Sequence, residues 1–523
     1  MNIKRAKQEI KDAIAAYLLK DEYGAYEIPV IRQRPILLLG APGIGKTQIM
    51  EQIARECGIG LVAYTITHHT RQSAIGLPFI SEMEFDGEKK AVTEYTMSEI
   101  VASIYEKMKK TGLREGILFI DEINCVSETL APAMLQFLQC KTFGNHPIPE
   151  GWIIVAAGNP PEYNKSVRDF DVVTLDRVKK IEVEPDYEVW REYALKARIH
   201  PAVISYLDAR PGHFYRMETT VDGKRFATPR GWEDLSRLLE VYEKLGKTAD
   251  KEVVLQYIQH EQIAGEFANY LELYRKYESD YGIGEILRGV IREETLKKLS
   301  HASFDERLSV VSLLLSGCMT EFHKVRVQEL FLEVLYGKMK EAGRLLSEGD
   351  AGRKTGAEEE DTPESDNGME SFAVLAKLRE EAGKEREAKK RAELLGREEE
   401  QRLLKIEETL SAYETELKKR RPTDGAAAFS ILRELFSEKR EQYEGLQEEG
   451  KEMLEHAFDF LEAAFGDSQE MVIFLTGLNS AEDAVAFLQT CDCERYRRYN
   501  QSLLFRESDR RLRGEIDRLL AET

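Results

Sequence analysis

One stretch of eight residues constrains the fold of this chain more than any other. Residues 40–47 read Gly-Ala-Pro-Gly-Ile-Gly-Lys-Thr and match the phosphate-loop pattern G-x-x-x-x-G-K-[ST] at every fixed position. An apolar run from Ile36 to Leu39 precedes this loop, and a segment of helical character, Gln48 to Glu56, follows it. A strand, a glycine loop and a helix in this order predict a parallel α/β sheet that binds a nucleoside triphosphate at the loop.

The chemistry expected at this loop follows from its residue types. Glycines let backbone N–H groups approach phosphate oxygens at a helix N-terminus, which already carries partial positive charge. Lys46 is expected to reach the β- and γ-phosphates of ATP, and the Thr47 hydroxyl to bind Mg²⁺. The alternative is a tight turn with a chance lysine, which the strand–loop–helix context disfavours. The predicted nucleotide-binding residues of this segment are Gly40, Pro42, Gly43, Ile44, Gly45, Lys46, Thr47 and Gln48.

A second apolar run ends in two acids. Residues 116–120 are followed by Asp121 and Glu122, about 75 residues after the loop. A buried parallel strand places the carboxylate that follows it at the carboxyl edge of the sheet, where ligands bind. Asp121 is therefore predicted to hold Mg²⁺ directly or through water, and Glu122 to orient and deprotonate an attacking water. The pair favours hydrolysis of ATP over binding alone.

These features, with four further segments, resemble the AAA+ ATPases and, among them, the MoxR branch. The resemblance covers roughly residues 1–275. Residues 152–160 are similar to the sensor 1 strand, which implies that Asn159 positions the lytic water. Residues 228–232 are similar to the sensor 2 motif, which implies that Arg230 senses the γ-phosphate. Residues 144–149 lie where these proteins carry a hairpin before sensor 1.

The fourth segment, Leu-Asp-Arg at residues 175–177, resembles a MoxR element whose arginine serves the nucleotide of a neighbouring subunit. Arg177 is expected to act in trans, with Arg168 as the other candidate, and a surface ion pair with Asp176 or Asp171 as the structural alternative. A trans-acting arginine requires a homo-oligomer, and a hexameric ring is the form expected. For Arg230 the alternative is a first-turn helix arginine with no ligand.

Two segments between the second strand and the acidic pair differ in what they predict. His68 and His69 depart from the MoxR pattern, and adjacent strand residues point to opposite faces, so polar loop residues are favoured over a metal site. Alternating residues on either side of Asp86-Gly87 predict a β-hairpin over 79–96. In the family that the chain resembles, this hairpin faces the ring channel, so Phe85 and Tyr95 are predicted either to grip a client or merely to pack on a helix.

Composition excludes several classes of function. The 523 residues carry a formal net charge of −20, which disfavours nucleic acid or a membrane surface as a partner of the whole chain. Six scattered cysteines form no disulfide or zinc framework, and no run has the length of a membrane span, so a cytoplasmic location is expected.

The rest of the chain is predicted to be helical. Four regions are expected: a nucleotide-binding core over 1–225, a helical lid and following helices over 226–345, an acidic flexible linker over 346–370, and a C-terminal helical arm over 371–523. Within the arm, residues 372–420 are expected to form one helix that ends at the turn over 421–425. Its apolar residues at 3-4 spacing predict a coiled-coil-like antiparallel hairpin with the helix that follows; they are Leu403, Ile406, Leu410, Tyr413 and Leu417.

The resemblance implies a chaperone-like motor that remodels or matures a partner protein. MoxR proteins commonly act with partners that bear a von Willebrand factor A domain, and this is the partner class expected. Two rival functions stay open: a nucleic-acid-linked motor subunit of the restriction or helicase-loading type, and a nucleotide-gated scaffold with little turnover.

Overall fold

A five-stranded parallel sheet forms the centre of the first of the two compact units into which the chain divides. The computed structural model describes residues 1–68, 71–85, 87–143, 146–163, 170–220, 223–355 and 367–502. The strand order is β2–β5–β8–β1–β9. The strands are β1 (Ile36–Gly40), β2 (Gly60–Thr65), β5 (Gly116–Asp121), β8 (Trp152–Gly158) and β9 (Lys179–Val183). Every residue of the central strand β8 is buried, as expected for a strand covered on both faces. The predicted P-loop α/β fold class is confirmed.

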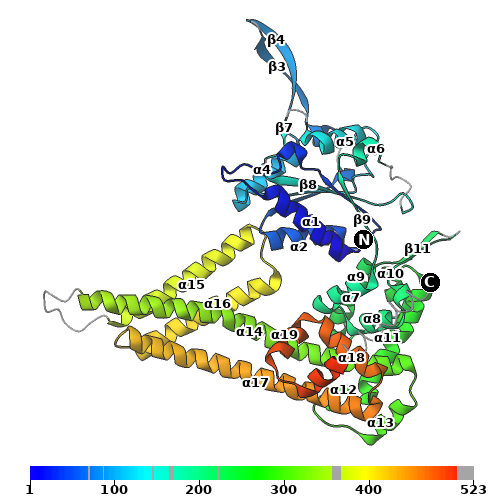
Figure 1. Cartoon of the computed structure of the whole chain (residues 1–523), viewed down its shortest axis with the longest axis vertical. Coiled ribbons are helices and arrows are strands. Elements are labelled where there is room, and N and C mark those ends of the chain that lie inside the picture. Colours follow the sequence, from blue (N-terminus) through cyan, green and yellow to red (C-terminus); the bar gives the residue numbers. More distant parts are fainter. Residues whose placement is uncertain are drawn as a thin grey trace, which may run out of the picture. The chain divides into compact units, whose positions relative to one another are not determined.

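Helices cover both faces of this sheet (Figure 1). On one face, apolar side chains of the strands form a core with α3, α4 and α5. The opposite face is covered by α1 and α2. The helices of this unit are α1 (Ile3–Leu18), η1 (Val30–Arg32), α2 (Lys46–Cys57), η2 (Ile66–His68), α3 (Arg71–Ile75), α4 (Glu99–Thr111), α5 (Ala131–Cys140) and α6 (Val172–Leu175).

The predicted β-hairpin projects from this unit as a two-stranded ribbon (Figure 1). It consists of β3 (Pro78–Phe85) and β4 (Glu88–Tyr95), and Asp86 of the predicted turn lies outside the described residues. Ile80 is 78% exposed and Phe85 47% exposed, so about half of the surface of Phe85 is open to solvent. A shorter hairpin of β6 (Thr142–Phe143) and β7 (His146–Pro147) precedes β8.

The second unit is almost wholly helical. Its elements are α7 (Tyr187–Lys196), which begins in the first unit, α8 (Pro201–Ala209), η3 (Pro211–His213), β10 (Arg216–Thr220), β11 (Gly223–Ala227), α9 (Pro229–Lys244), α10 (Lys251–Tyr257), α11 (Glu261–Tyr281), α12 (Ile283–Ile286), α13 (Glu293–Ser300), α14 (Phe304–Thr355), α15 (Asn367–Arg391), α16 (Arg397–Arg420), α17 (Gly425–Phe465), α18 (Gln469–Ser480) and α19 (Glu482–Thr490). Residues 228–231 and 384–400 belong to the first unit.

The two units divide at Val189 and Trp190, earlier in the chain than the predicted core boundary at 225. The reason is the aromatic packing of α8. The ring centroid of Tyr206 lies 5.8 Å from that of Trp232 and 5.2 Å from that of Phe267, so α8 shares its core with the lid helices.

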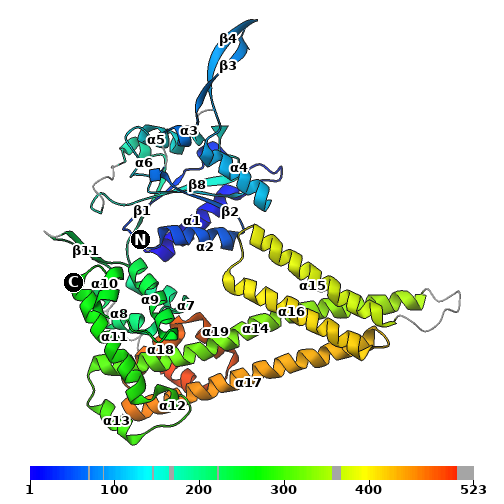
Figure 2. The same ribbon diagram turned by 180° about the vertical axis from the view of Figure 1, so that it is seen from behind.

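The C-terminal arm differs from the predicted two-helix hairpin. The predicted stripe Leu403, Ile406, Leu410, Tyr413 and Leu417 is buried, but it packs into a core to which α14, α15, α16 and α17 all contribute. Helix α17 runs antiparallel to α14, with which it lies side by side (Figure 1, Figure 2). The long apolar side of α17 therefore has two partners, and a coiled coil of two helices is not what forms.

The prediction of a flexible linker over 346–370 is wrong at both ends of that range. Residues 346–355 continue α14, and residues 367–370 begin α15; residues 356–366 lie outside the described part of the chain. The single helix predicted between 372 and 420 is interrupted at 392–396, where the chain turns between α15 and α16.

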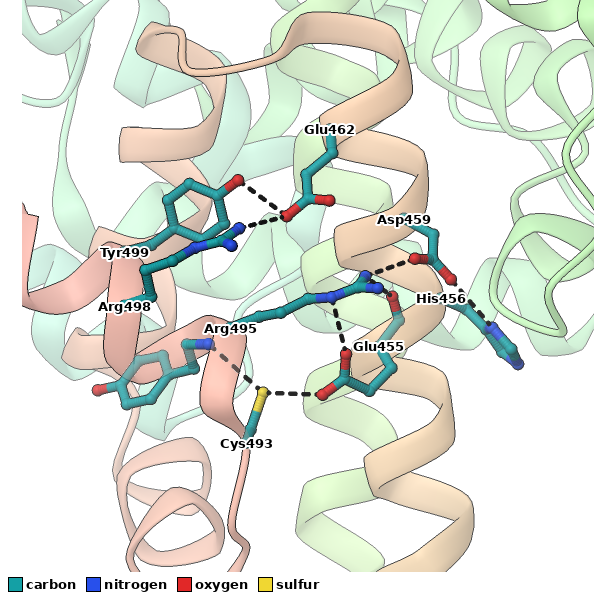
Figure 3. A network of polar contacts seen from close by, with 9 residues as sticks. Glu455, His456, Asp459, Glu462, Cys493, Arg495, Arg498 and Tyr499 are labelled. Atoms are coloured by element: carbon teal, nitrogen blue, oxygen red, sulfur yellow. Dashed lines mark hydrogen bonds and ion pairs between the residues drawn. The ribbon is translucent and has the colours of Figure 1, made fainter.

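Polar contacts fasten the segment after α19 to α17 (Figure 3). The Arg495 guanidinium contacts Glu455 at 3.3 Å and Asp459, while the Tyr499 hydroxyl donates to Glu462 at 2.8 Å. The buried Cys493 thiol donates to Glu455, and burial raises its pKa to about 12. All six cysteines are free in the structure.

Within the described residues, no helix is by itself long and apolar enough to cross a membrane; only α18 and α19 taken together, bent by 91° at their junction, have the length and composition.

Candidate functional site

The loop between β1 and α2 has the backbone geometry that phosphate binding needs. Gly43 and Gly45 adopt φ angles of 76° and 92°, which residues with a side chain rarely adopt. A Cβ atom at Gly43 would lie 3.1 Å from the Thr228 side chain, so the close approach also requires glycine. The N-cap residue of α2 is Gly45, which has no side chain to cap the first N–H groups of the helix. An anion suits such a helix end.

Lys46 points from the start of α2 into the sheet edge. Its Nζ donates to the carbonyl oxygens of Gly40 and Ala41, both at 2.8 Å, and to Asn159 Oδ1 at 2.9 Å. Only 8% of Lys46 is exposed, and burial lowers the pKa of its ammonium to about 8, against the opposing charge of Asp121. The three donors of the ammonium are all used within a buried setting, so the lysine is held in one position.

Thr47 and Asp121 form a pair of oxygen ligands. The Thr47 hydroxyl donates to Asp121 Oδ2 at 2.8 Å, and Asp121 Oδ1 accepts from the backbone N–H of Glu122 at 2.9 Å. A hydroxyl and a carboxylate are hard oxygen donors of the kind that Mg²⁺ prefers. The residues present therefore fit the predicted magnesium site. Groups of three or more His, Cys, Asp or Glu that would suit a different metal do not occur in the described ranges.

Glu122 sits on a strained turn immediately after β5. Its φ angle of 57° is left-handed, a conformation that costs free energy in a residue with a side chain and that recurs at functional sites. Its Oε2 accepts from the Thr67 hydroxyl at 3.2 Å, and the next residue, Ile123, donates its N–H to Ala157 O at 2.9 Å. The Thr67 hydroxyl of η2 thus contacts the carboxylate, while the backbone bond to β8 holds the turn that carries it.

Asn124 links this turn to the end of β8. Its Nδ2 donates to the backbone carbonyl of Asn159 at 2.8 Å, while Asn159 itself accepts from Lys46 through its side chain. Asn124 is buried, and a Cβ at Gly158 would lie 2.5 Å from its Oδ1, so the glycine makes room for the amide. Asn124 and Thr67 are the two site residues that the sequence interpretation missed. The only feature of the sequence that could have indicated them is that each is a polar residue shortly after a strand, at the edge of the sheet where ligands bind.

Arg230 lies beside the loop. Its backbone N–H donates to Gly43 O at 3.1 Å, and its guanidinium is near enough to Lys46 to help lower the pKa of that ammonium. Thr228 Oγ1 accepts from Gly231 N at 3.2 Å and so shapes the turn that presents Arg230. Sequence reasoning placed Arg230 at the γ-phosphate, and the structure brings it to the phosphate loop.

Arg177 lies at the other end of the sheet. It precedes Lys179, which pairs with Ile36 at the start of β1, whereas the loop follows the end of β1. The length of β1, roughly 13 Å at about 3.3 Å per residue, separates the two ends. The exposed Arg177 guanidinium donates to Gln139 Oε1, and its charge is a minor cause of the lowered pKa of Asp171, after hydrogen bonds from Thr174. The structure thus brings every predicted site residue to the loop except Arg177.

Two predicted positions cannot be placed. Arg168 and His69 lie outside the described residues, and the side chain of His68 is not described.

The sheet order, the glycine loop, and the lysine, threonine and aspartate around it define a P-loop nucleotide-binding domain. A comparison with protein families carries this one step further. Residues 35–178 match the family model of an AAA domain of the dynein-related subfamily, which supports an AAA+ ATPase domain in this part of the chain. No curated protein matches the chain.

Proposed function

We propose that this chain hydrolyses ATP as a ring-forming AAA+ motor of the MoxR type that remodels or matures a partner protein. The observation that carries the proposal is the convergence at one loop of Lys46 from the start of α2, Asp121 and Glu122 from the end of β5, and Asn159 from the end of β8. Arg177 lies at the opposite end of the strands. A domain that only bound nucleotide would have no need of an oriented carboxylate or of an outward arginine.

Each residue around the loop has a separate role in the proposed hydrolysis of ATP. Lys46 and the loop N–H groups bind the phosphates, and Arg230 adds positive charge beside the γ-phosphate. When bound through Thr47 and Asp121, Mg²⁺ neutralises charge on the β- and γ-phosphates. Glu122 accepts a proton from the attacking water, and Asn159 holds that water in line. Proton removal and positioning, with no covalent intermediate on the protein, suffice for phosphoryl transfer.

The position of Arg177 favours an assembly of several subunits. A guanidinium at the amino end of the sheet cannot reach its own loop, but it reaches that of a neighbour if subunits contact through this edge. A hexameric ring is the assembly that the MoxR resemblance implies. In such a ring the exposed residues of β3 and β4, Ile80 and Phe85 among them, are the proposed contacts with a client.

The client belongs to the proposal as well. By the same resemblance it is a protein with a von Willebrand factor A domain. The net charge of −20 argues against the rival nucleic-acid motor, and the oriented Glu122 argues against a scaffold with little turnover.

Turnover per subunit is expected to rise steeply with protein concentration and then reach a plateau, because Arg177 completes the site of a neighbouring subunit. Arg177→Ala should lower the plateau by about 10³-fold, since a trans-acting arginine contributes roughly 10³–10⁵ in rate, while ATP affinity stays nearly unchanged. Phosphate release measured from nanomolar to micromolar protein tests both points.

The same variant distinguishes action in trans from action in cis. An equimolar mixture of Arg177→Ala and Glu122→Gln chains should regain part of the turnover, because a site is complete wherever an Arg177→Ala chain supplies Glu122 and its Glu122→Gln neighbour supplies Arg177. Arg32→Ala, which removes another exposed arginine of this unit, serves as the matched control. Full activity of Arg177→Ala alone would assign the role to Arg168 instead.

Asn124→Ala is expected to lower turnover about tenfold and to change ATP affinity less than about twofold. The lost hydrogen bond to the Asn159 carbonyl, of about 1 kcal/mol, positions a residue that acts on water and does not itself touch nucleotide. Steady-state rates and nucleotide titrations together give this comparison. Equal losses in rate and affinity would show instead that Asn124 only holds the loop together.

A further inference from the structure

The turn between α15 and α16 belongs to a different unit from the helices that carry it. Residues 384–400 belong to the first unit, whereas the chain before and after them, 232–383 and 401–523, belongs to the second. The turn is formed by residues 392–396 (Figure 2). Residues 384–400, which include the end of α15 and the start of α16, are thus part of the unit that contains the nucleotide-binding core.

One carboxylate makes the contact with α4. Glu393 Oε2 lies 2.6 Å from Lys107 Nζ, and Glu393 Oε1 lies 3.0 Å from Lys110 Nζ, across 286 and 283 residues of chain. The Lys107 side chain is only 11% exposed, whereas those of Glu393 and Lys110 are 55% and 64% exposed, so the pair with Lys107 is the less screened of the two. Hydrogen bonds from the two lysines lower the pKa of Glu393.

The backbone conformation at Glu393 is one that glycine adopts more easily than glutamate. Its φ angle is 60°, and the next residue, Leu394, donates its N–H back to Lys389 O at 3.1 Å. This left-handed position at a helix end is usually occupied by glycine, which adopts it without strain. A glycine would make the same turn at lower cost but would remove the carboxylate. The side chain of Glu393, not the turn itself, accounts for the residue at this position.

The surface that receives the turn is basic. Lys107 and Lys110 lie in the last turns of α4, and a Cβ at Gly396 would lie 3.8 Å from Arg55 Nη1, near the end of α2. Next to the turn, ion pairs join the two helices, at 3.1 Å between Lys389 and Glu399. The turn is therefore held in shape by its own helices while Glu393 faces the core.

We propose that the Lys107–Lys110 end of α4, with Arg55 of α2 beside it, is a docking surface for the α15–α16 turn of the same chain through Glu393, and that docking restrains the helix that carries the phosphate loop. Helix α2 is continuous from Lys46 and Thr47 in its first turn to Arg55 in its last. A restraint at its far end therefore acts on the position of the phosphate-binding groups. The occupant of the surface follows from charge complementarity and from the two ion pairs.

Hydrogen–deuterium exchange of the turn amides tests the docking itself. Glu393→Lys should make residues 392–396 and the end of α4 exchange about tenfold faster, because two attractive pairs become repulsive. Adding Lys107→Glu and Lys110→Glu to that variant should restore most of the protection. Glu408→Lys, the same charge change at an exposed position of α16, is the matched control. Unchanged exchange in Glu393→Lys would overturn the proposal.

A second measurement tests the restraint, and this part rests on the proposed ATPase activity. Glu393→Lys should lower turnover about threefold or more, because a less restrained α2 holds the phosphate-binding groups less well, and the charge-swapped variant should recover it. If exchange rises while turnover stays the same or increases, docking occurs but the proposed restraint is wrong. If the unaltered chain has no turnover at all, the proposed function fails while the exchange result still decides the docking.

Discussion

Lys46→Ala is expected to abolish ATP binding, with a loss of at least about 100-fold in affinity. The ammonium is the one cation buried at the loop between Gly40, Ala41 and Asn159 in the described site, and its position is set by three hydrogen bonds. Its removal deletes a charge-assisted contact to phosphate, and such contacts contribute about 1.5–3 kcal/mol each. Titration with a fluorescent ATP analogue at saturating Mg²⁺ measures the change.

Folding must be checked in the same variant, because Lys46 also satisfies two backbone carbonyls. The thermal midpoint should fall only slightly, since alanine keeps the helix and water can reach the vacated acceptors. Lys109→Ala, at an exposed position of α4 in the same unit, controls for the loss of a positive charge. Tight ATP binding by a folded Lys46→Ala chain would contradict the assignment of the loop.

Glu122→Gln is expected to bind ATP as well as the unaltered chain does and to hydrolyse it at least about 100-fold more slowly. Glutamine keeps the shape of the side chain, and the Thr67 hydroxyl can still donate to its amide oxygen. The amide accepts no proton, so the attacking water loses its base. Because ATP stays bound, the assembled form should accumulate, which light scattering with and without ATP would detect.

A control separates the loss of the base from a change in local charge. Glu106→Gln, at an exposed position of α4 in the same unit, should leave turnover unchanged. Brisk hydrolysis by Glu122→Gln would mean that another group orients the water. Weak ATP binding by this variant would mean that the turn at its φ of 57° depends on the carboxylate for its shape.

The sequence predicted best where function depends on residues close together in the chain. The loop at 40–47 and the acidic pair at 121–122 are local patterns that require one backbone geometry, and the structure has both at the expected sheet edge. The hairpin over 79–96 was equally local, because alternation and a turn dipeptide define it. Arg230 was found only through the resemblance, since nothing in its own neighbourhood points to a loop nearly 200 residues earlier.

Prediction failed where long-range packing decides the outcome. The acidic composition of 346–370 predicted a linker, yet α14 continues to Thr355, and Leu346 is buried in the core that α14 shares with α15, α16 and α17. The apolar stripe of α16 predicted a partner helix but not that four helices share its core. Periodicity identifies the face that a helix buries; it does not identify what covers that face.

By itself, then, the sequence determined the sheet-and-loop architecture and the identity of the groups at the phosphate edge, because spacing and residue type dictate both. Only the tertiary structure decided that Asn124 and Thr67 contact residues predicted to be catalytic, and that Glu393 meets Lys107 across 286 residues. Such contacts depend on which surfaces meet when the chain closes long loops, and that is a property of packing which no local pattern carries.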